Sequence, residues 1–273
     1  MIVFVSFYLQ DQMSDFLLRR TTVTSRIEQV NELDPPTLTI CIDPPFKISL
    51  AKKYNLKVIS DTAQAPGALY HERYAGTLAD IGGYSLNYHK HIHTGEGGIL
   101  VTNDDELANV IRGIVNHGMY ERYYHDEIGV NSRLDSIQAA ILNVKLKYLD
   151  KYNKRRQEAA NHYNAAFENI DQIEVPFIES DIDSHVYHQY TLKIINGKRD
   201  ELADHLLKNN IPFGIYYPLG FHEQKAYKQE FVSDNDFPVT NKVKNQVISL
   251  PMHTELSKKQ IKFISNTIIS FFE

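Results

Sequence analysis

The chain has 273 residues, of which 42% are hydrophobic and 23% are charged, and its formal net charge is −5. This composition is typical of a globular protein with a core of its own, and the mild acidity disfavours nucleic acid and anionic membranes as partners. The single cysteine, Cys41, excludes an intramolecular disulfide framework and suits a reducing compartment, so we expect a cytoplasmic protein.

The first half of the chain alternates strand and helix patterns. MIVFVSFYL (1–9) predicts a strand, because it has no basic front or cleavage site and is too short to span a bilayer. KISLAKKYN (47–55) is typical of a helix and LKVISD (56–61) of a buried strand, which together form half of an α/β unit. GGILVTND (97–104) predicts another strand, and DELANVIRGIVNHG (105–118) predicts a helix that stops at a glycine.

The second half predicts a smaller domain. From Leu134 on, apolar residues at helical spacing indicate one face of a long helix that leads out of the first domain. We expect the first domain over residues 1–150 and the second over 151–273. The elements predicted in the second are a further helix beyond about residue 155, a strand in 185–195, a helix in 199–210, a loop around 217–220 and a closing helix after residue 256.

One stretch carries residues suited to chemistry. GYSLNYHKHIHTGEGGILVTND (83–104) places Lys90 in a loop, and Asp61 ends an earlier strand. Catalysis on pyridoxal phosphate requires an amine that binds the aldehyde and moves protons, and a carboxylate that keeps the pyridine nitrogen protonated. Taken alone, a solvated surface lysine and a capping or turn aspartate are the better explanations.

Five motifs together change this balance. They are KVISDTAQAPGA, DIGGYSLNYHKHIHTGEGGILVTND, VNHG, IGVNSRLDSIQAAIL and SLPMHTELS. In this order and spacing, from about residue 47 to the C-terminus, they resemble the pyridoxal-phosphate sugar aminotransferases of the family often named after DegT, DnrJ, EryC and StrS. The resemblance implies an enzyme that moves an amino group from an amino acid, most often L-glutamate, to a keto group of a nucleotide-linked deoxysugar.

The resemblance also implies a fold. We expect an α/β protein of fold-type I, with a large cofactor-binding domain in three layers, α/β/α, and a small α+β C-terminal domain. The large domain would be N-terminally incomplete in this chain.

Site residues follow from the same resemblance. It implies that Asp61 partners the pyridinium nitrogen, that Gln64 bonds the ring's 3-hydroxyl, that Ser85 binds the phosphate and that Lys90 binds the cofactor covalently. Asn131 would reach the phosphate of the neighbouring subunit, which implies a homodimer with shared active sites. A carboxylate, an amide and a hydroxyl suit these roles chemically. Singly, a strand-end serine, a turn glutamine and a capping asparagine remain alternatives.

The three histidines around Lys90 allow a second interpretation. His89, His91 and His93 could bind a metal, but alternating residues on an irregular loop do not converge and no carboxylate completes a set, so we expect no metal. In related sugar dehydratases a histidine replaces the lysine. Counting back from Gly95 places the family's lysine on Lys90, which favours transamination.

Two further groups of residues carry weaker predictions. Gly95, Gly97 and Gly98 indicate backbone geometry and not a phosphate loop, since no Gly-Lys-Ser/Thr follows them. DSHVYHQYTLKI and GIYYPLGFHEQKAYK resemble segments that face the substrate in this family. They make His185, Tyr190 and Tyr217 candidates for binding the nucleotide-linked keto-sugar, although aromatic residues on such strands more often fill a core.

The front of the chain departs from the family. Full-length relatives carry a longer front with a Gly-Thr/Ser helix N-terminus that grips the cofactor phosphate and an aromatic residue that stacks on the ring. Here residues 1–46 contain no glycine. We expect binding of pyridoxal phosphate weakened by roughly two orders of magnitude, and little turnover. The alternative to an enzyme is a non-catalytic remnant or assembly subunit. The sequence does not determine whether a 3-keto or a 4-keto carbon of the sugar is aminated, or which nucleotide the sugar carries.

Overall fold

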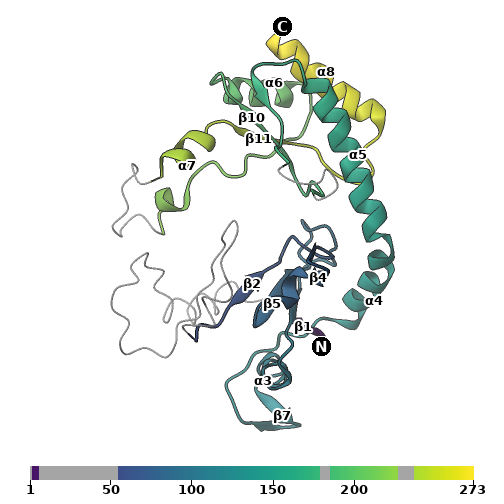
Figure 1. The fold of residues 1–273 in the computed structure, drawn as a ribbon, viewed down its shortest axis with the longest axis vertical. Coiled ribbons are helices and arrows are strands. Elements are labelled where there is room, and N and C mark those ends of the chain that lie inside the picture. The colour runs from purple at the N-terminus through teal and green to yellow at the C-terminus, as the bar shows by residue number, and fades with distance from the viewer. Residues whose placement is uncertain (1, 6–54, 179–184, 227–236) are drawn as a thin grey trace. The chain divides into compact units, whose positions relative to one another are not determined.

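A computed structural model describes residues 2–5, 55–178, 185–226 and 237–273 (Figure 1). The chain divides into two compact units, Met1–Leu149 and Asp150–Glu273. Both combine helices and strands, so the protein is α/β. The helix predicted over 47–55, except its last residue, and the glycine-free front beyond residue 5 lie outside the described residues. Among the helices that the structure describes, none has the length and apolar character of a membrane span.

A four-stranded sheet organises the first unit. Its order is β1 (Ile2–Val5), β6 (Gly98–Val101), β5 (Ile81–Ser85) and β2 (Ile59–Asp61). β2 and β5 are parallel, whereas β6 runs antiparallel to both β5 and β1. The strands predicted at the N-terminus, before Asp61 and after Gly97 are confirmed as β1, β2 and β6.

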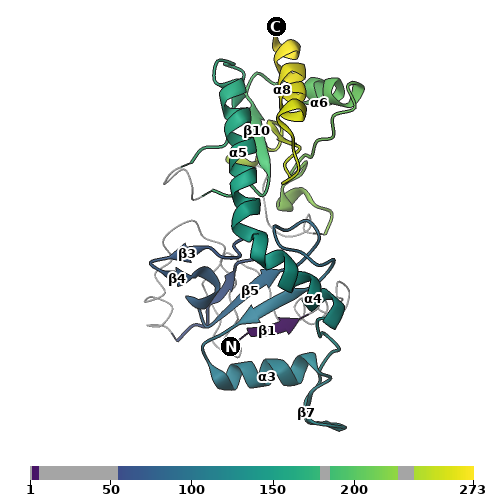
Figure 2. The same cartoon turned by 90° about the vertical axis from the view of Figure 1, so that its right-hand side faces the viewer.

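The predicted helix after β6 is α3 (Asp105–Val115), which runs along one face of the sheet (Figure 2). The carboxylate of Asp104 caps it by accepting from the Leu107 amide at 3.0 Å. Its apolar side, Ile111 and Val115, packs on Ile81 and Leu100 of the sheet. The unit also contains the short elements β3 (Leu69–Tyr70), β4 (Arg73–Tyr74), η1 (Ala75–Thr77), β7 (Met119–Glu121) and β8 (Tyr124–His125).

The glycine predicted to end this helix has a specific role. Gly118 has a φ of +74°, and a Cβ added to it would lie 1.8 Å from the carbonyl oxygen of Glu127. Its amide donates to the carbonyl of Gly113 at 2.8 Å. Only glycine accepts both the left-handed conformation and the close backbone, so the chain can turn sharply after α3.

The long helix predicted from Leu134 forms as a nearly continuous helical run. α4 (Ser136–Lys145) leads into a 3₁₀ turn, η2 (Leu146–Tyr148), and then into α5 (Leu149–Phe167). The predicted apolar face on α4 is present, but Ile137 and Val144 are 77% and 59% exposed. The helix predicted beyond residue 155 is therefore the later part of α5.

A three-stranded antiparallel sheet forms the centre of the second unit. Its order is β11 (Val247–Leu250), β10 (Tyr190–Ile194) and β9 (Ile173–Glu174). Alternate residues of β10 are fully buried, and they join one core with side chains of α5, α6 (Arg199–Lys208) and α8 (Lys258–Phe272) (Figure 1). The remaining elements are η4 (Phe221–Glu223) and α7 (Pro238–Val243).

Arg156 of α5 holds the segment before β10. Its Nη1 donates to the carbonyls of Tyr187 and His188, both at 3.1 Å, and of Met252 at 3.2 Å. These carbonyls lie outside the strand ladder and need another donor. This explains why the predicted strand over 185–195 begins only at Tyr190: the preceding residues bond to a side chain instead of a strand. Burial lowers the pKa of Arg156.

We predict that Arg156→Leu lowers the free energy of unfolding of the second unit by about 2–4 kcal/mol, because it leaves buried carbonyls without a donor. Arg155→Leu is the matched control. Its ion pair with Glu255 lies at the surface, so its loss costs less than about 1 kcal/mol. Urea denaturation measures both, and equal losses in the two variants would contradict the role given to Arg156.

Candidate functional site

The sheet of the first unit brings two predicted site residues to one edge. Asp61 ends β2 and Ser85 ends β5, and the two strands are parallel. Asp61 pairs with Gly83, and Ser85 lies two residues further on. Because residues two apart share a face of a strand, both side chains lie on one face at the carboxyl edge of the sheet. Gly83 contributes no side chain between them.

The chain turns immediately after Asp61. Thr62 is buried, and both its amide and its hydroxyl donate to the carbonyl of Gly83, at 3.0 and 2.9 Å. Asp61 Oδ1 accepts from the amide of Ala63 at 3.0 Å. Gln64 follows in the same turn with an exposed side chain. Asp61 therefore does act as a turn residue, as the alternative explanation stated. The turn uses only one carboxylate oxygen, and the side chain stays exposed at the edge of the sheet.

Lys90 lies in the loop that joins β5 to β6. The Lys90 amide donates to the carbonyl of Asn87 at 2.8 Å, and the Ser85 hydroxyl accepts from the Asn87 amide at 3.2 Å. Asn87 also bonds the carboxylate of Glu96 across the loop, at 2.7 and 2.9 Å. The Lys90 side chain is half-buried, and none of the described residues pairs with its amine. A loop held by hydrogen bonds therefore carries, a few residues beyond Ser85, a lysine amine that pairs with none of the described residues.

Helix α4 anchors the same loop from outside the sheet. Gln138 Nε2 donates to the carbonyls of Thr94 at 3.1 Å and Glu96 at 2.6 Å. Lys145 Nζ donates to the carbonyl of His93 at 2.9 Å. Sequence reasoning did not single out Gln138 or Lys145. The signal for Gln138 was its place in the motif IGVNSRLDSIQAAIL, whereas Lys145 gave none.

The histidines around Lys90 occupy three different environments. His89 is exposed, His91 is buried, and His93 contacts Lys145 of α4. Gly95 and Gly97 have φ of +96° and +154°, values that favour glycine. This geometry fits the interpretation of these glycines as backbone turns.

Asn131 lies in a different part of the first unit. It forms an isolated bridge with Asn116 beyond the end of α3, and its side chain is exposed and accepts from Arg133 Nε at 3.4 Å. The flanking amides of Val130 and Ser132 donate to the carbonyls of Ile114 and Val115 at the end of α3, at 2.7 and 2.9 Å. That Asn131 binds the cofactor phosphate of a neighbouring subunit remains a proposal.

The three candidates in the second unit differ in exposure. Tyr217 is exposed, and half-buried His185 stacks on Tyr187 with ring centroids 4.3 Å apart. Burial lowers the pKa of His185. Tyr190 is fully buried, and its hydroxyl donates to Asn164 at 2.6 Å. It therefore takes the alternative role of a core aromatic, and we leave it out of the proposal below.

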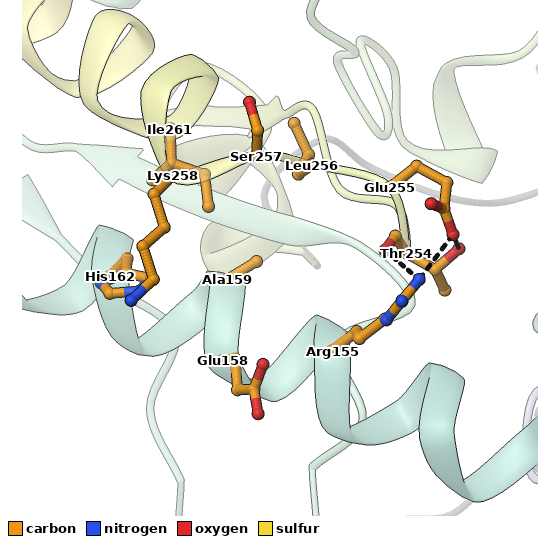
Figure 3. Close-up of a pocket in the computed structure, with 10 residues that line it drawn as sticks. All are labelled: Arg155, Glu158, Ala159, His162, Thr254, Glu255, Leu256, Ser257, Lys258 and Ile261. Carbon is orange, nitrogen blue, oxygen red and sulfur yellow. Dashed lines mark hydrogen bonds and ion pairs between the residues drawn. The ribbon is translucent and has the colours of Figure 1, made fainter.

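A cavity of about 360 Å³ lies between α5 and the start of α8 in the second unit (Figure 3). Its lining mixes Arg155, Lys258 and His162 with Glu158 and Glu255, and Arg155 is already paired with Glu255. No residue predicted for the site lines this cavity. The cavity therefore adds nothing to the chemistry at the edge of the sheet.

Residues 47–269 match the DegT/DnrJ/EryC1/StrS aminotransferase family. The chain belongs to this family. The match includes Asp61, Ser85 and Lys90, and it begins at the residue where the motif resemblance begins.

Two curated relatives are 38% identical to the chain. A pleiotropic regulatory protein of Geobacillus stearothermophilus aligns over 82% of this chain and 60% of its own length. A dTDP-3-amino-3,6-dideoxy-alpha-D-galactopyranose transaminase of Aneurinibacillus thermoaerophilus aligns over 80% and 59%. The chain thus spans about 60% of the length of the curated relatives it matches.

Solved structures of family members share the fold. DesV of S. venezuelae superimposes with a TM-score of 0.75 at 32% identity, over 84% of this chain and 62% of DesV. NtdA of Bacillus subtilis, solved with bound cofactor PMP, gives 0.69 at 26% identity, over 82% of this chain and 52% of its own. The expected fold-type I relationship is confirmed over these shares, while the three-layer arrangement remains a proposal.

We predict that Tyr190→Phe lowers the free energy of unfolding by about 0.5–1.5 kcal/mol, because it removes a buried hydrogen bond to Asn164. Tyr217→Phe is the control and should change it by less than about 0.5 kcal/mol, since Tyr217 is exposed. Equilibrium denaturation measures both. A Tyr190→Phe variant as stable as the wild type would contradict the core role.

Proposed function

We propose that this chain carries the cofactor site of a pyridoxal-phosphate-dependent aminotransferase that acts on a nucleotide-linked keto-sugar. The observation that carries the proposal is the placement of Asp61 and Ser85 on one face of one sheet edge, with Lys90, whose amine pairs with none of the described residues, in the loop that follows Ser85. Family membership supports it, and so do a transaminase among the curated relatives and PMP in NtdA.

The residues at the edge fit this cofactor chemically. An exposed carboxylate suits a protonated ring nitrogen, a hydroxyl suits a phosphate, and a lysine amine without a described partner suits an aldehyde. In this assignment Asp61 holds the ring nitrogen, Gln64 the 3-hydroxyl, Ser85 the phosphate and Lys90 the aldehyde carbon.

The chain's own residues would then divide the work. The bound cofactor supplies an electron sink for the amino acid's α-carbon. The Asp61 carboxylate keeps a proton on the ring nitrogen, and the exposed amide of Gln64 orients the ring. Lys90 Nζ would serve as the base that takes the proton from the donor's α-carbon in the first half-reaction. In the second it would deliver a proton to the sugar carbon that receives the amine.

The substrates follow from the relatives. The transaminase from Aneurinibacillus is named for a dTDP-linked amino sugar, and a Pseudomonas aeruginosa relative for a UDP-linked 3-oxo sugar. We therefore propose a nucleotide-linked keto-deoxysugar as acceptor. L-glutamate is the donor that the motif resemblance implies, and we propose it on that ground. Exposed Tyr217 and half-buried His185 are the candidates in the second unit for contact with the acceptor.

We further propose a homodimer formed through the first unit. Apolar side chains are exposed on one side of α4, where Ile137 at 77% and Val144 at 59% lie seven residues, or two helical turns, apart. Exposed apolar residues grouped in this way mark interaction surfaces. A second copy on this surface would bring in the partner's loop containing Asn131, as the family resemblance implies.

We expect the purified chain, at pyridoxal phosphate concentrations high enough to offset weak binding, to release 2-oxoglutarate from L-glutamate in the donor half-reaction. Without an acceptor sugar the amino group stays on the cofactor, so the release is stoichiometric with the chain and needs no turnover. Lys90→Ala should abolish it. Lys147→Ala, at an exposed position on η2, is the matched control and should retain it. A coupled 2-oxoglutarate assay measures the reaction. Equal release by the wild type and Lys90→Ala, or none from the wild type at saturating cofactor, would contradict the proposal.

We predict that Ile137→Asp raises the dissociation constant of self-association at least tenfold, because it buries a charge in an apolar interface. Aspartate in the first turn of α4 suits the helix dipole, so the helix itself should persist. Sedimentation equilibrium measures the effect. Ile195→Asp, at an exposed position of the second unit, should leave association unchanged. A wild type that is monomeric at micromolar concentration would refute the dimer.

A further inference from the structure

Helix α4 touches the Lys90 loop at points that sheet pairing does not reach. Two side chains of α4, Gln138 and Lys145, make three contacts with the loop, at the carbonyls of His93, Thr94 and Glu96. Unpaired backbone carbonyls need donors, so these two side chains complete the bonding of the loop's second half.

Gln138 is fully engaged in this contact. Its two N–H groups donate to Thr94 and Glu96, and its Oε1 accepts from the amide of Asp135 at 3.2 Å. The hydroxyl of Thr94 returns a bond to the carbonyl of Gln138 at 3.1 Å. An amide with every hydrogen-bonding group satisfied has one defined orientation, so the loop is held in one register against the helix.

Lys145, near the C-terminal end of α4, makes the second contact with the loop. Its amine donates to the carbonyl of His93 and lies 3.1 and 3.2 Å from the two ring nitrogens of His93. Burial lowers the pKa of Lys145. Gln138 and Lys145 are seven residues apart, two turns of helix, and therefore share one side of α4.

Between these anchors and β5, backbone hydrogen bonds close the loop that carries Lys90. Leu86 donates to Gly97 at 2.8 Å and Thr94 donates to Leu86 at 3.1 Å, which closes the loop at its base. The Lys90 amide bonds only locally, to Asn87. The segment that carries Lys90 therefore lies between the hydrogen bonds at the base of the loop and the contacts that the loop makes with α4.

We propose that Gln138 and Lys145 are positioning residues that fix Lys90 for its reaction. This inference rests on the proposed function of Lys90. Reacting groups must be held within a fraction of an ångström of their productive position, so loss of a loop anchor should weaken reaction more than it weakens substrate binding.

The first test is amide hydrogen exchange in the cofactor-free chain. Gln138→Leu and Lys145→Met should accelerate exchange of the Leu86 and Thr94 amides at least tenfold, while amides of α8 stay unchanged and report an intact fold. Lys145→Arg keeps a donor and should restore protection, and Lys147→Met should have no effect. Unchanged exchange in the loop of both variants would overturn the proposal.

The second test reads the amine itself. In competitive acylation of the cofactor-free chain, Gln138→Leu should raise the rate at Lys90 at least threefold relative to exposed Lys57, because the half-buried amine is released. Faster exchange with unchanged acylation would show that the loop moves without its amine, and would overturn positioning. Neither test uses the cofactor, so failure of the proposed transamination leaves both results readable.

Discussion

The parallel pairing of β2 with β5 is the constraint on which the candidate site depends. It aligns the ends of two strands that lie more than twenty residues apart in sequence, so that Asp61 and Ser85 emerge at one edge. Thr62 strengthens the alignment by donating twice to the carbonyl of Gly83. Shifting the register by one residue would turn one of the two side chains to the opposite face. The juxtaposition proposed for the cofactor, of Asp61 with Ser85 and the Lys90 loop, depends on this pairing and on the loop that β5 leads into.

Helix α4 connects that loop to the exposed surface of the first unit. The side of α4 that carries Gln138 and Lys145 bonds the loop, while Ile137 and Val144 remain exposed. A partner bound to the exposed residues would restrain the helix and, through it, the loop. In this account the proposed self-association and the placement of Lys90 both depend on one helix, so a dimer formed through α4 would be coupled to the proposed site.

The sequence predicted the elements and the motif residues better than it predicted contacts. Strand β2, helix α3 and the long helical run followed from local apolar spacing and, for α3, from the glycine that ends it, Gly118. Asp61, Gln64, Ser85, Lys90 and Asn131 were assigned only by the order of several motifs. The motif IGVNSRLDSIQAAIL marks Gln138 only as part of a helix start, because its partners Thr94 and Glu96 lie more than forty residues away. Tyr190 could not be assigned to core or site, since alternation on a strand does not reveal which face is buried.

Covalent attachment at Lys90 is the most direct test of the central claim. The wild-type chain is incubated with pyridoxal phosphate, reduced with borohydride and digested, and the labelled peptide is identified by mass spectrometry. We predict a single dominant label on Lys90, in the peptide that contains the β5–β6 loop. Label spread over surface lysines, or a dominant label on any other lysine that persists when Lys90 is replaced by alanine, would contradict the account.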